Sequence, residues 1–495
     1  MKFERASGIL LHPTSLPGRF GIGDLGENAY KFVDLLLEWQ QTFWQVCPLG
    51  PTGYGDSPYQ CFSAFAGNPL LISLEKLIGE GFLTQQDLAA QEAFNDNSVD
   101  YGKVMMFEYT LLWRAYERFA AAANAAQRAK FESFCHYQAA WLDDYSLFMA
   151  LKAHHNGAAW NTWEWDLVAR NPGALDYWRG QLAYQIGYQK FLQAVFFDQW
   201  LELKAYANRN HLKIIGDIPI FVAFDSADAW AHRDLFFFDQ GGTPTAVAGV
   251  PPDYFSPTGQ LWGNPLYRWD VMKSQGYQWW IERFTKTFEV VDIVRLDHFR
   301  GFAKYWSVPF GQPNAIQGSW EPGPGADLFH AVEAALGKLP IIAEDLGVIT
   351  PDVVALREAF AFPGMKILQF AFDSSEANNY LPHTYDQNCV VYTGTHDNDT
   401  TLGWYRKCAD KDREWVHTYL DTDGKDICWD FIRAAWASVA DIAIIPVQDL
   451  LGLDSDARMN TPATSGQNWK WRFTWDMLRP ELGQRLKRLT QMYDR

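Results

Sequence analysis

Asp292-Ile293-Val294-Arg295-Leu296-Asp297 is a short run of mostly aliphatic residues that ends on a carboxylate, and runs of this kind recur along the chain. Each ends in a polar or Gly/Pro-rich corner, and most are followed by a helical pattern. Eight are found, at residues 8–12, 43–47, 212–217, 292–297, 339–344, 366–370, 389–393 and 441–447. Strands that alternate with helices predict a parallel sheet of the α/β class, and eight such units predict a (β/α)8 TIM barrel.

The unequal spacing of the eight runs predicts where the barrel carries insertions. Between the second and third strands an Ala-rich helical pattern dominates, which predicts a helical subdomain at residues 66–205. Between the third and fourth strands a Gly/Pro-rich, aromatic stretch predicts a lid-like insertion at residues 223–288, because the loops after barrel strands build the active site. We therefore expect a single catalytic barrel over residues 1–495, with large insertions after strands 2 and 3 and no separate C-terminal β-domain.

Composition excludes several classes of protein. The 495 residues include 42 basic and 59 acidic side chains, and the formal net charge of −17 disfavours nucleic acid and anionic membranes as partners. No apolar run approaches the ~18 residues of a membrane span, and His12 and Pro13 interrupt the apolar run near the N-terminus before a signal peptide could form. The six cysteines include no CxxC pair, so we expect reduced core residues of a cytoplasmic protein.

Aromatic residues are abundant, since 34 Phe, 23 Trp and 22 Tyr make up 16% of the chain. Two interpretations of the tryptophans stay open at this point. They pack in the core, or some of them form partly exposed platforms for the apolar faces of sugar rings.

Two segments resemble cofactor or metal motifs only superficially. Residues 21–26 match the GxGxxG pattern of dinucleotide-binding loops, but Pro17-Gly18 separates them from the preceding strand, and Asp24 would place a carboxylate against a pyrophosphate. Residues 421–426 look like a calcium loop, yet Gly424 stands at the fourth place rather than the sixth. The sequence holds neither an HExxH motif nor a Cys/His cluster, so we expect no cofactor and no metal ion.

Acidic residues stand at or just after the ends of four predicted strands: Asp217, Asp297, Glu344 and Asp397. In a barrel the carboxyl ends of the strands surround one pocket, so acids far apart in sequence become neighbours there. Carboxylates that share a cavity raise one another's pKa, which makes such a cluster costly unless it serves a function. Helix N-caps and loop salt bridges are the alternative explanation.

Arg295 separates the roles of two of these acids. Strand alternation places Arg295 and Asp297 on the same face, so the guanidinium should keep Asp297 ionised, as a nucleophile must be. Glu344 has no adjacent basic residue, so it should hold its proton more tightly. One ionised and one protonated acid form the pair that retaining glycoside chemistry needs. His298 and the His396-Asp397 pair would then bind sugar hydroxyls, although an ordinary loop hydrogen bond is the alternative for each histidine.

Further motifs extend along nearly the whole chain. They are residues 11–17 (LHPTSLP), 48–59 (PLGPTGYGDSPY), 216–220 (GDIPI), 250–255 (VPPDYF), 294–301 (VRLDHFRG), 343–347 (AEDLG), 395–398 (THDN) and 458–462 (RMNTP). With these motifs the chain resembles the 4-alpha-glucanotransferases of the amylomaltase (disproportionating enzyme) type, within the alpha-amylase clan. The catalytic motifs fit the whole clan, whereas residues 48–59 and 250–255 point to this subgroup.

The resemblance implies roles for individual residues. Asp297 would be the nucleophile, Glu344 the general acid/base, and Asp397 a third carboxylate that holds and distorts the donor sugar. The implied substrate-binding residues are Asp217, Arg295, His396, Ser57, Tyr59, Trp262, Tyr254, Asp373 and Asn460. The chain departs from the family pattern at Cys47, Cys61 and Ala463.

The resemblance also implies a reaction. Segments of α-1,4-glucan would move from a donor to the 4-hydroxyl of an acceptor glucan or glucose by a retaining double displacement. The expected partners are maltooligosaccharides, starch or glycogen-type glucans. An α-glucan hydrolase of the same clan is one alternative, and a non-catalytic glucan-binding protein on a decayed barrel is another. The latter would have lost an acid, whereas all three are present.

Overall fold

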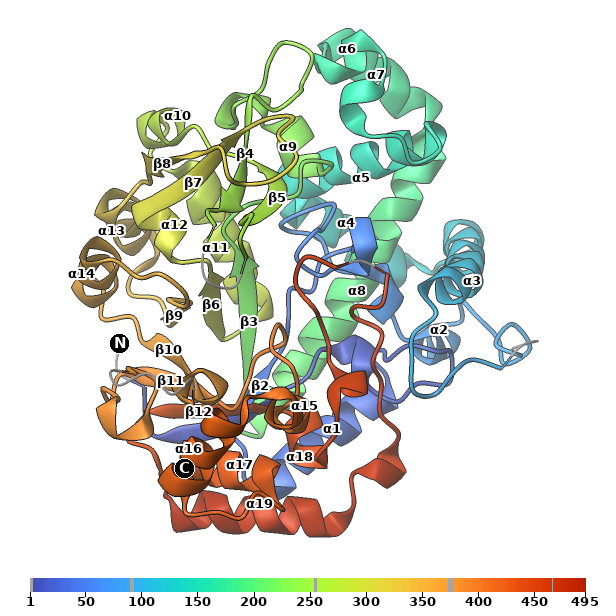
Figure 1. Cartoon of the computed structure of the whole chain (residues 1–495). Coiled ribbons are helices and arrows are strands. Elements are labelled where there is room, and N and C mark those ends of the chain that lie inside the picture. The colour runs from blue at the N-terminus through green and yellow to red at the C-terminus, as the bar shows by residue number, and fades with distance from the viewer. Residues whose placement is uncertain (1–2, 90–92, 253–255, 373–377, 465) are drawn as a thin grey trace.

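The main sheet of the protein is an eight-stranded parallel barrel. The computed structural model describes residues 3–89, 93–252, 256–372, 378–464 and 466–495, and the sheet is counted within them. Its strands are, in order around the sheet, β10 (Gly364–Ile367), β11 (Cys389–Tyr392), β12 (Ile442–Pro446), β1 (Ala6–Leu10), β2 (Phe43–Gln45), β3 (Lys213–Pro219), β6 (Ile293–Asp297) and β9 (Ile341–Ala343). The Ala343 N–H donates to the Pro363 carbonyl at 2.9 Å and joins β9 to the start of β10. The eight predicted strands are therefore confirmed (Figure 1).

β12 illustrates how the strands are buried on both faces. Ile442 and Ile444 pack with apolar residues of the other strands inside the barrel, whereas Ala443 and Ile445 belong to the layer between sheet and helices. This alternation follows from the two-residue period of a strand. The barrel interior contains Leu10, Phe43, Ile215, Ile293, Ile342, Met365, Ile367, Val390, Tyr392, Ile442 and Ile444.

Some strand ends differ from the prediction. The strand expected at 8–12 ends at Leu10, and the one expected at 366–370 ends at Ile367, because a 3-10 turn begins at Leu368. β3 instead continues past Asp217 to Pro219, so Asp217 lies within the strand rather than at its end.

Helices cover the outer face of the barrel (Figure 1). They are α1 (Glu27–Glu38), α8 (Ala183–Arg209), α11 (Gln278–Val290), α13 (Ala326–Leu336), α14 (Pro351–Ala359), α17 (Ile427–Ala437) and α19 (Pro480–Met492). α1 shows why they dock. Its buried residues Ala29, Phe32, Val33 and Leu36 recur at helical spacing and form one apolar stripe.

The region expected to be helical, residues 66–205, does contain a group of helices. They are α2 (Leu74–Gly79), α3 (Tyr101–Ala122), α4 (Ala125–Tyr137), α5 (Ala139–His154), α6 (Trp165–Val168) and α7 (Pro172–Gln181). α8 is common to this group and to the barrel, since it contacts both α5 and β3. Figure 1 shows α5, α6 and α7 gathered to one side of the barrel, away from α15 to α19.

A second, antiparallel sheet has the order β5-β4-β7-β8. Its strands are β4 (Ala246–Val250), β5 (Gln260–Pro265), β7 (Lys304–Pro309) and β8 (Ser319–Pro322). Only β4 and β5 come from the stretch expected as a lid, because β7 and β8 follow β6. The expected large insertions follow strands 2 and 3, and β7 and β8 form a shorter insertion after β6 that was not expected from the sequence. The expected lid range of 223–288 also takes in most of α11, which contacts β6 as a barrel helix.

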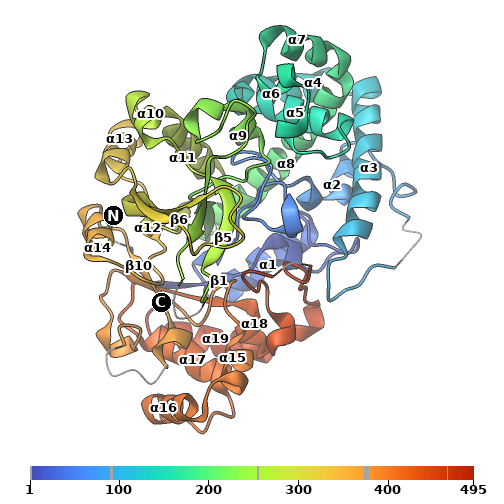
Figure 2. The ribbon, with the colours of Figure 1, turned by 45° about the horizontal axis from the view of Figure 1, so that its top comes forward.

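The remaining helices are short or peripheral. They are α9 (Ala227–Ala231), α10 (Trp269–Ser274), α12 (Arg300–Ala303), α15 (Thr401–Lys407), α16 (Asp410–Leu420) and α18 (Val447–Leu451). Figure 2 shows α16 projecting at the bottom, below α15 and α17. After β12 the described residues form helices and turns without a further strand. Of the helices that the structure describes, none is both long and apolar enough to cross a membrane.

Candidate active site

Arg295 lies at the centre of the acids that the barrel brings together. This buried side chain on β6 donates from Nη1 to Asp217 Oδ2 at 2.5 Å, and its Nη2 lies 2.8 Å from Asp297 Oδ1. The prediction that Arg295 and Asp297 share a face is confirmed. Burial would lower the pKa of Arg295, but the two carboxylates raise it well above its ordinary value.

Asp297, the last residue of β6, combines this ion pair with access from the pocket. Its side chain is 28% exposed, whereas the side chain of Arg295 is almost fully covered. A carboxylate fixed by a guanidinium on one side and open on the other can approach a bound molecule.

Glu344 directly follows β9 and is held by backbone donors. The His298 N–H donates to Oε2 at 2.7 Å, and the Leu346 N–H donates to Oε1 at 2.9 Å. Burial, and next the charge of Asp297, raises the pKa of Glu344, although Arg295 and these N–H groups act in the opposite direction. The direction agrees with the prediction, but the main cause is burial and not the absence of a basic neighbour.

Asp397 follows β11 and is fixed by the adjacent His396 and by one other segment, residues 458–460. Asn460 Nδ2 donates to its Oδ1 at 2.6 Å, and His396 Nε2 lies 3.3 Å from its Oδ2. Arg458 donates to the Asp397 backbone carbonyl at 2.5 Å. Desolvation would raise the pKa of Asp397, but His396 and Asn460 outweigh it and hold the pKa well below the ordinary range. Asp397 is therefore ionised.

Tyr59 links the acids on opposite sides of the pocket. Its hydroxyl donates to Asp217 Oδ2 at 3.0 Å and lies 3.4 Å from His396 Nδ1. The rings of Tyr59 and His396 stack with centroids 4.9 Å apart. The pKa of His396 is raised, because Asp397 and Asp217 outweigh the burial that would lower it. Ser57 shapes this loop, since its Oγ accepts the Tyr59 N–H at 3.2 Å.

Trp262 reaches the site from β5 of the small sheet. Its ring stands edge-on to His298 with centroids 4.7 Å apart, and its Nε1 donates to Gln260 Oε1 at 3.1 Å. Because His298 follows Asp297, Trp262 lies beside the acids. Tyr254 and Asp373 lie outside the described residues.

Sequence reasoning did not single out Arg458 or Trp469. Arg458 lies within one of the sequence motifs, but reasoning from the ends of strands gave it no role, because its loop is far from β11 in the sequence. Trp469 is 3% exposed and contacts the rings of Tyr59 and His396, each at 5.8 Å. No local pattern around Trp469 marks this contact.

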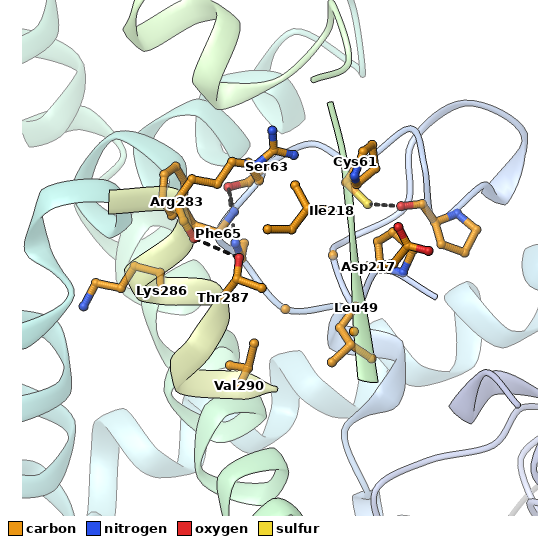
Figure 3. A pocket seen from close by; sticks show the side chains of 18 of the residues that line it. Leu49, Cys61, Ser63, Phe65, Asp217, Ile218, Arg283, Lys286, Thr287 and Val290 are labelled. Atoms are coloured by element: carbon orange, nitrogen blue, oxygen red, sulfur yellow. Dashed lines mark hydrogen bonds between the residues drawn. The ribbon is translucent and has the colours of Figure 1, made fainter. Parts of the chain in front are cut away.

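A cavity of about 90 Å³ borders the site behind the barrel wall. Figure 3 shows Arg283, Lys286 and Thr287 of α11 on one side of it and Leu49 and Cys61 on the other. The cavity reaches the acids only through Tyr59 and Asp217, so it is distinct from the space between Asp297 and Glu344. Within the described part of the chain, no group of three or more His, Cys, Asp or Glu could hold a metal ion.

A parallel barrel whose strand ends bring three carboxyl groups to one pocket, with the pKa of Glu344 raised and that of Asp397 lowered, defines a class of enzyme, the barrel enzymes that act on glycosidic bonds. Comparison with known proteins narrows this class. The family model described as 4-alpha-glucanotransferase matches residues 11–478. The chain belongs to the 4-alpha-glucanotransferase family.

Individual relatives are similar to this chain over nearly its full length. The 4-alpha-glucanotransferase of Synechocystis sp. is 51% identical, with 99% of this chain and 98% of the relative covered. The 4-alpha-glucanotransferase of Thermus thermophilus is 48% identical, with 100% of both chains covered. The structure of amylomaltase from Streptococcus agalactiae in complex with acarbose has a TM-score of 0.97 at 40% identity and covers 99% of this chain and 100% of its own.

Proposed function

We propose that this 4-alpha-glucanotransferase works by a retaining double displacement. Glu344 protonates the bridging oxygen of an α-1,4 linkage while Asp297 attacks the anomeric carbon, and the shortened glucan leaves with a free 4-hydroxyl. The 4-hydroxyl of an acceptor then attacks the covalent glycosyl-enzyme, and the ionised Glu344 takes its proton. Asp297 leaves as a carboxylate, so both acids return to their starting states.

The observation that carries this proposal is the difference between the surroundings of Asp297 and those of Glu344. Arg295 pairs with Asp297 at 2.8 Å, which favours the charged form that a nucleophile needs. Burial raises the pKa of Glu344, which favours the protonated form that a general acid needs.

The surrounding polar groups suit the donor sugar. We assign Asp397, ionised and held by Asn460, to the hydroxyls of the sugar whose bond is cleaved. Tyr59 joins His396 to Asp217, so the three side chains form a polar wall that can match several hydroxyls. We place Ser57, Tyr254 and Asp373 among the further substrate-binding residues.

We assign the small antiparallel sheet to the transfer of the glucan segment to an acceptor. Its strands come after β3 and β6, the strands that carry Asp217 and Asp297, and it brings Trp262 to His298. An aromatic surface here offers an apolar face to an acceptor sugar and keeps water from the glycosyl-enzyme. We propose the 223–288 insertion as a lid and 66–205 as a helical subdomain on one catalytic barrel.

The proposed substrates are maltooligosaccharides and starch or glycogen-type glucans, with neither nucleic acid nor membrane as partner. A net charge of −17 supports that exclusion, since polyanions are repelled by such a surface. We place the enzyme in the cytoplasm, where the six free cysteines would stay reduced.

Incubation with maltotriose tests the function directly. Transfer produces a ladder of longer maltooligosaccharides together with shorter products, which chromatography separates. Asp297→Asn is the matched control, because it keeps the shape of the side chain and removes the nucleophile. Products of maltose and glucose alone would identify a hydrolase, and no turnover with tight maltotriose binding would identify a binding protein.

A further inference from the structure

We propose that Trp469 is a positioning residue of this active site, an inference that rests on the function proposed above. Its indole holds the ring pair formed by Tyr59 and His396 without touching the substrate. The side chain is only 3% exposed, so it offers no free face on which a sugar could stack. Its effect on the reaction must therefore pass through the rings beside it.

The three rings form one cluster. The Trp469 centroid lies 5.8 Å from that of Tyr59 and 5.8 Å from that of His396, at interplanar angles of 37° and 34°. The indole thus contacts both members of the stack, whose own centroids are 4.9 Å apart. A tilt of either ring requires the indole to move as well, because close-packed interiors leave little free space.

The ring pair carries the polar atoms that reach two acids. The Tyr59 hydroxyl donates to Asp217 at 3.0 Å, and His396 Nε2 lies 3.3 Å from Asp397. Each of these contacts depends on the orientation of its ring. Fixing the two rings therefore fixes the hydrogen-bonding geometry on both sides of the donor sugar.

Trp469 itself is held by its backbone in an unusual conformation. Its φ is +65°, in the left-handed region that bulky residues avoid. The Trp469 N–H donates to the Met459 carbonyl at 2.7 Å, and the Tyr101 hydroxyl donates to the Trp469 carbonyl at 2.9 Å. Such strain persists only where the surroundings fix it, and it is concentrated at functional sites.

The next residues attach this segment to the start of α3. The Val99 N–H donates to the Lys470 carbonyl at 2.7 Å, and the Arg472 N–H donates to the Asn97 carbonyl at 3.1 Å. The indole therefore rests on a backbone support outside the barrel strands. This support explains how one side chain can set the position of two rings that come from different loops.

Trp469→Leu tests the proposal, because leucine removes the flat ring. We expect kcat/KM for maltotriose to fall about 10- to 100-fold, the size of effect that a displacement of about 1 Å has in an active site. Trp469→Phe keeps a flat apolar ring and should restore activity to within about threefold of the natural protein. Trp471→Leu is the matched control. This buried tryptophan of the same segment stacks on Phe473, 6.1 Å away, and should stay near wild-type activity.

A double-mutant cycle distinguishes positioning from a general loss of stability. In a His396→Asn background one of the two rings that Trp469 holds is gone, so Trp469→Leu should reduce activity by a smaller factor there than in the natural protein. Melting temperatures measured for all variants show which losses follow unfolding. If Trp469→Leu fails to fold, Trp469→His takes its place in the double-mutant cycle, because histidine has a flat but smaller ring.

Two results would overturn the inference. One is a full additive loss in the His396→Asn background, and the other is a Trp469→Leu enzyme with wild-type activity. Both results are compared with the activity of the natural protein, which must first be shown to form the maltooligosaccharide ladder. A natural protein without that ladder contradicts the proposed function instead, so the two failures are distinguishable.

Discussion

At the scale of single residues, the proposed mechanism assigns the chemistry to Asp297 and Glu344. Asp297→Asn should lower kcat on maltotriose by more than about 1,000-fold, because the amide cannot form the glycosyl-enzyme. Circular dichroism should be unchanged, since the replacement preserves the shape of the side chain. Steady-state assays with chromatographic detection measure the loss. A variant with more than a few per cent of wild-type activity would exclude Asp297 as nucleophile.

Glu344→Gln should damage the reaction in a different way. Loss of the general acid should lower the rate on maltotriose by about 100- to 10,000-fold. A maltosyl fluoride donor needs no proton on its leaving group, so it should still glycosylate Asp297. The release of fluoride measures this first step. Wild-type turnover of maltotriose by Glu344→Gln would contradict the acid/base assignment.

The raised pKa of Glu344 predicts a pH dependence. The first step needs Glu344 protonated, so kcat/KM should fall as the pH rises through its pKa. Burial places this fall above the ordinary glutamate value of about 4.3. A pH profile on maltotriose measures the midpoint. With the fluoride donor, kcat/KM of Glu344→Gln should no longer fall as the pH rises. A fall that persists in this variant would show that another group causes it.

Among the structural elements, the proposed function gives β5 the choice between acceptor sugar and water. Trp262→Ala removes an indole beside His298, and the loss of its apolar contact should cost an acceptor about 1–2 kcal/mol, at ~25 cal/mol per Å². Water does not lose that contact. We expect transfer to fall more than donor consumption, which the ratio of ladder products to free glucose measures. Trp320→Ala on β8 is the control, since Trp320 faces Arg300. An equal change in both variants would remove Trp262 from the acceptor site.

The same elements show what the sequence could predict. β12 was predictable because it is a continuous apolar run, and β6 because its run is mostly aliphatic, while the Arg295–Asp297 pair followed from alternation within that strand. β8 was not predictable, because Ser319-Trp320-Glu321-Pro322 is mostly exposed and gains its order from pairing with β7. The support of Asp397 by Asn460 was not derivable from periodicity either, since the two residues come from separate loops.

The ends of the described chain meet in the whole molecule. Arg5, ahead of β1, donates to the Trp436 and Ser438 carbonyls at the end of α17 and to the Tyr493 carbonyl, each at 2.8 Å. Arg5→Ala removes these three hydrogen bonds, although Arg495 still donates to the Trp436 and Ser438 carbonyls, and the loss should cost about 1–3 kcal/mol of stability. Thermal unfolding should show a melting temperature lower by a few degrees. Arg19→Ala is the control, because exposed Arg19 makes one hydrogen bond of 3.4 Å, and an equal shift would contradict the prediction.

The place of β1 between β12 and β2 has a consequence for how the protein is made. Ala6 pairs with Ile442, so β1 leaves the ribosome long before its partner strand β12 has been made. At 5–20 residues per second this takes roughly 20 to 90 s. During that time the edge of β1 that later binds β12 stays unpaired, and such edges attract other chains. Newly made chains should therefore depend on chaperones until translation passes β12.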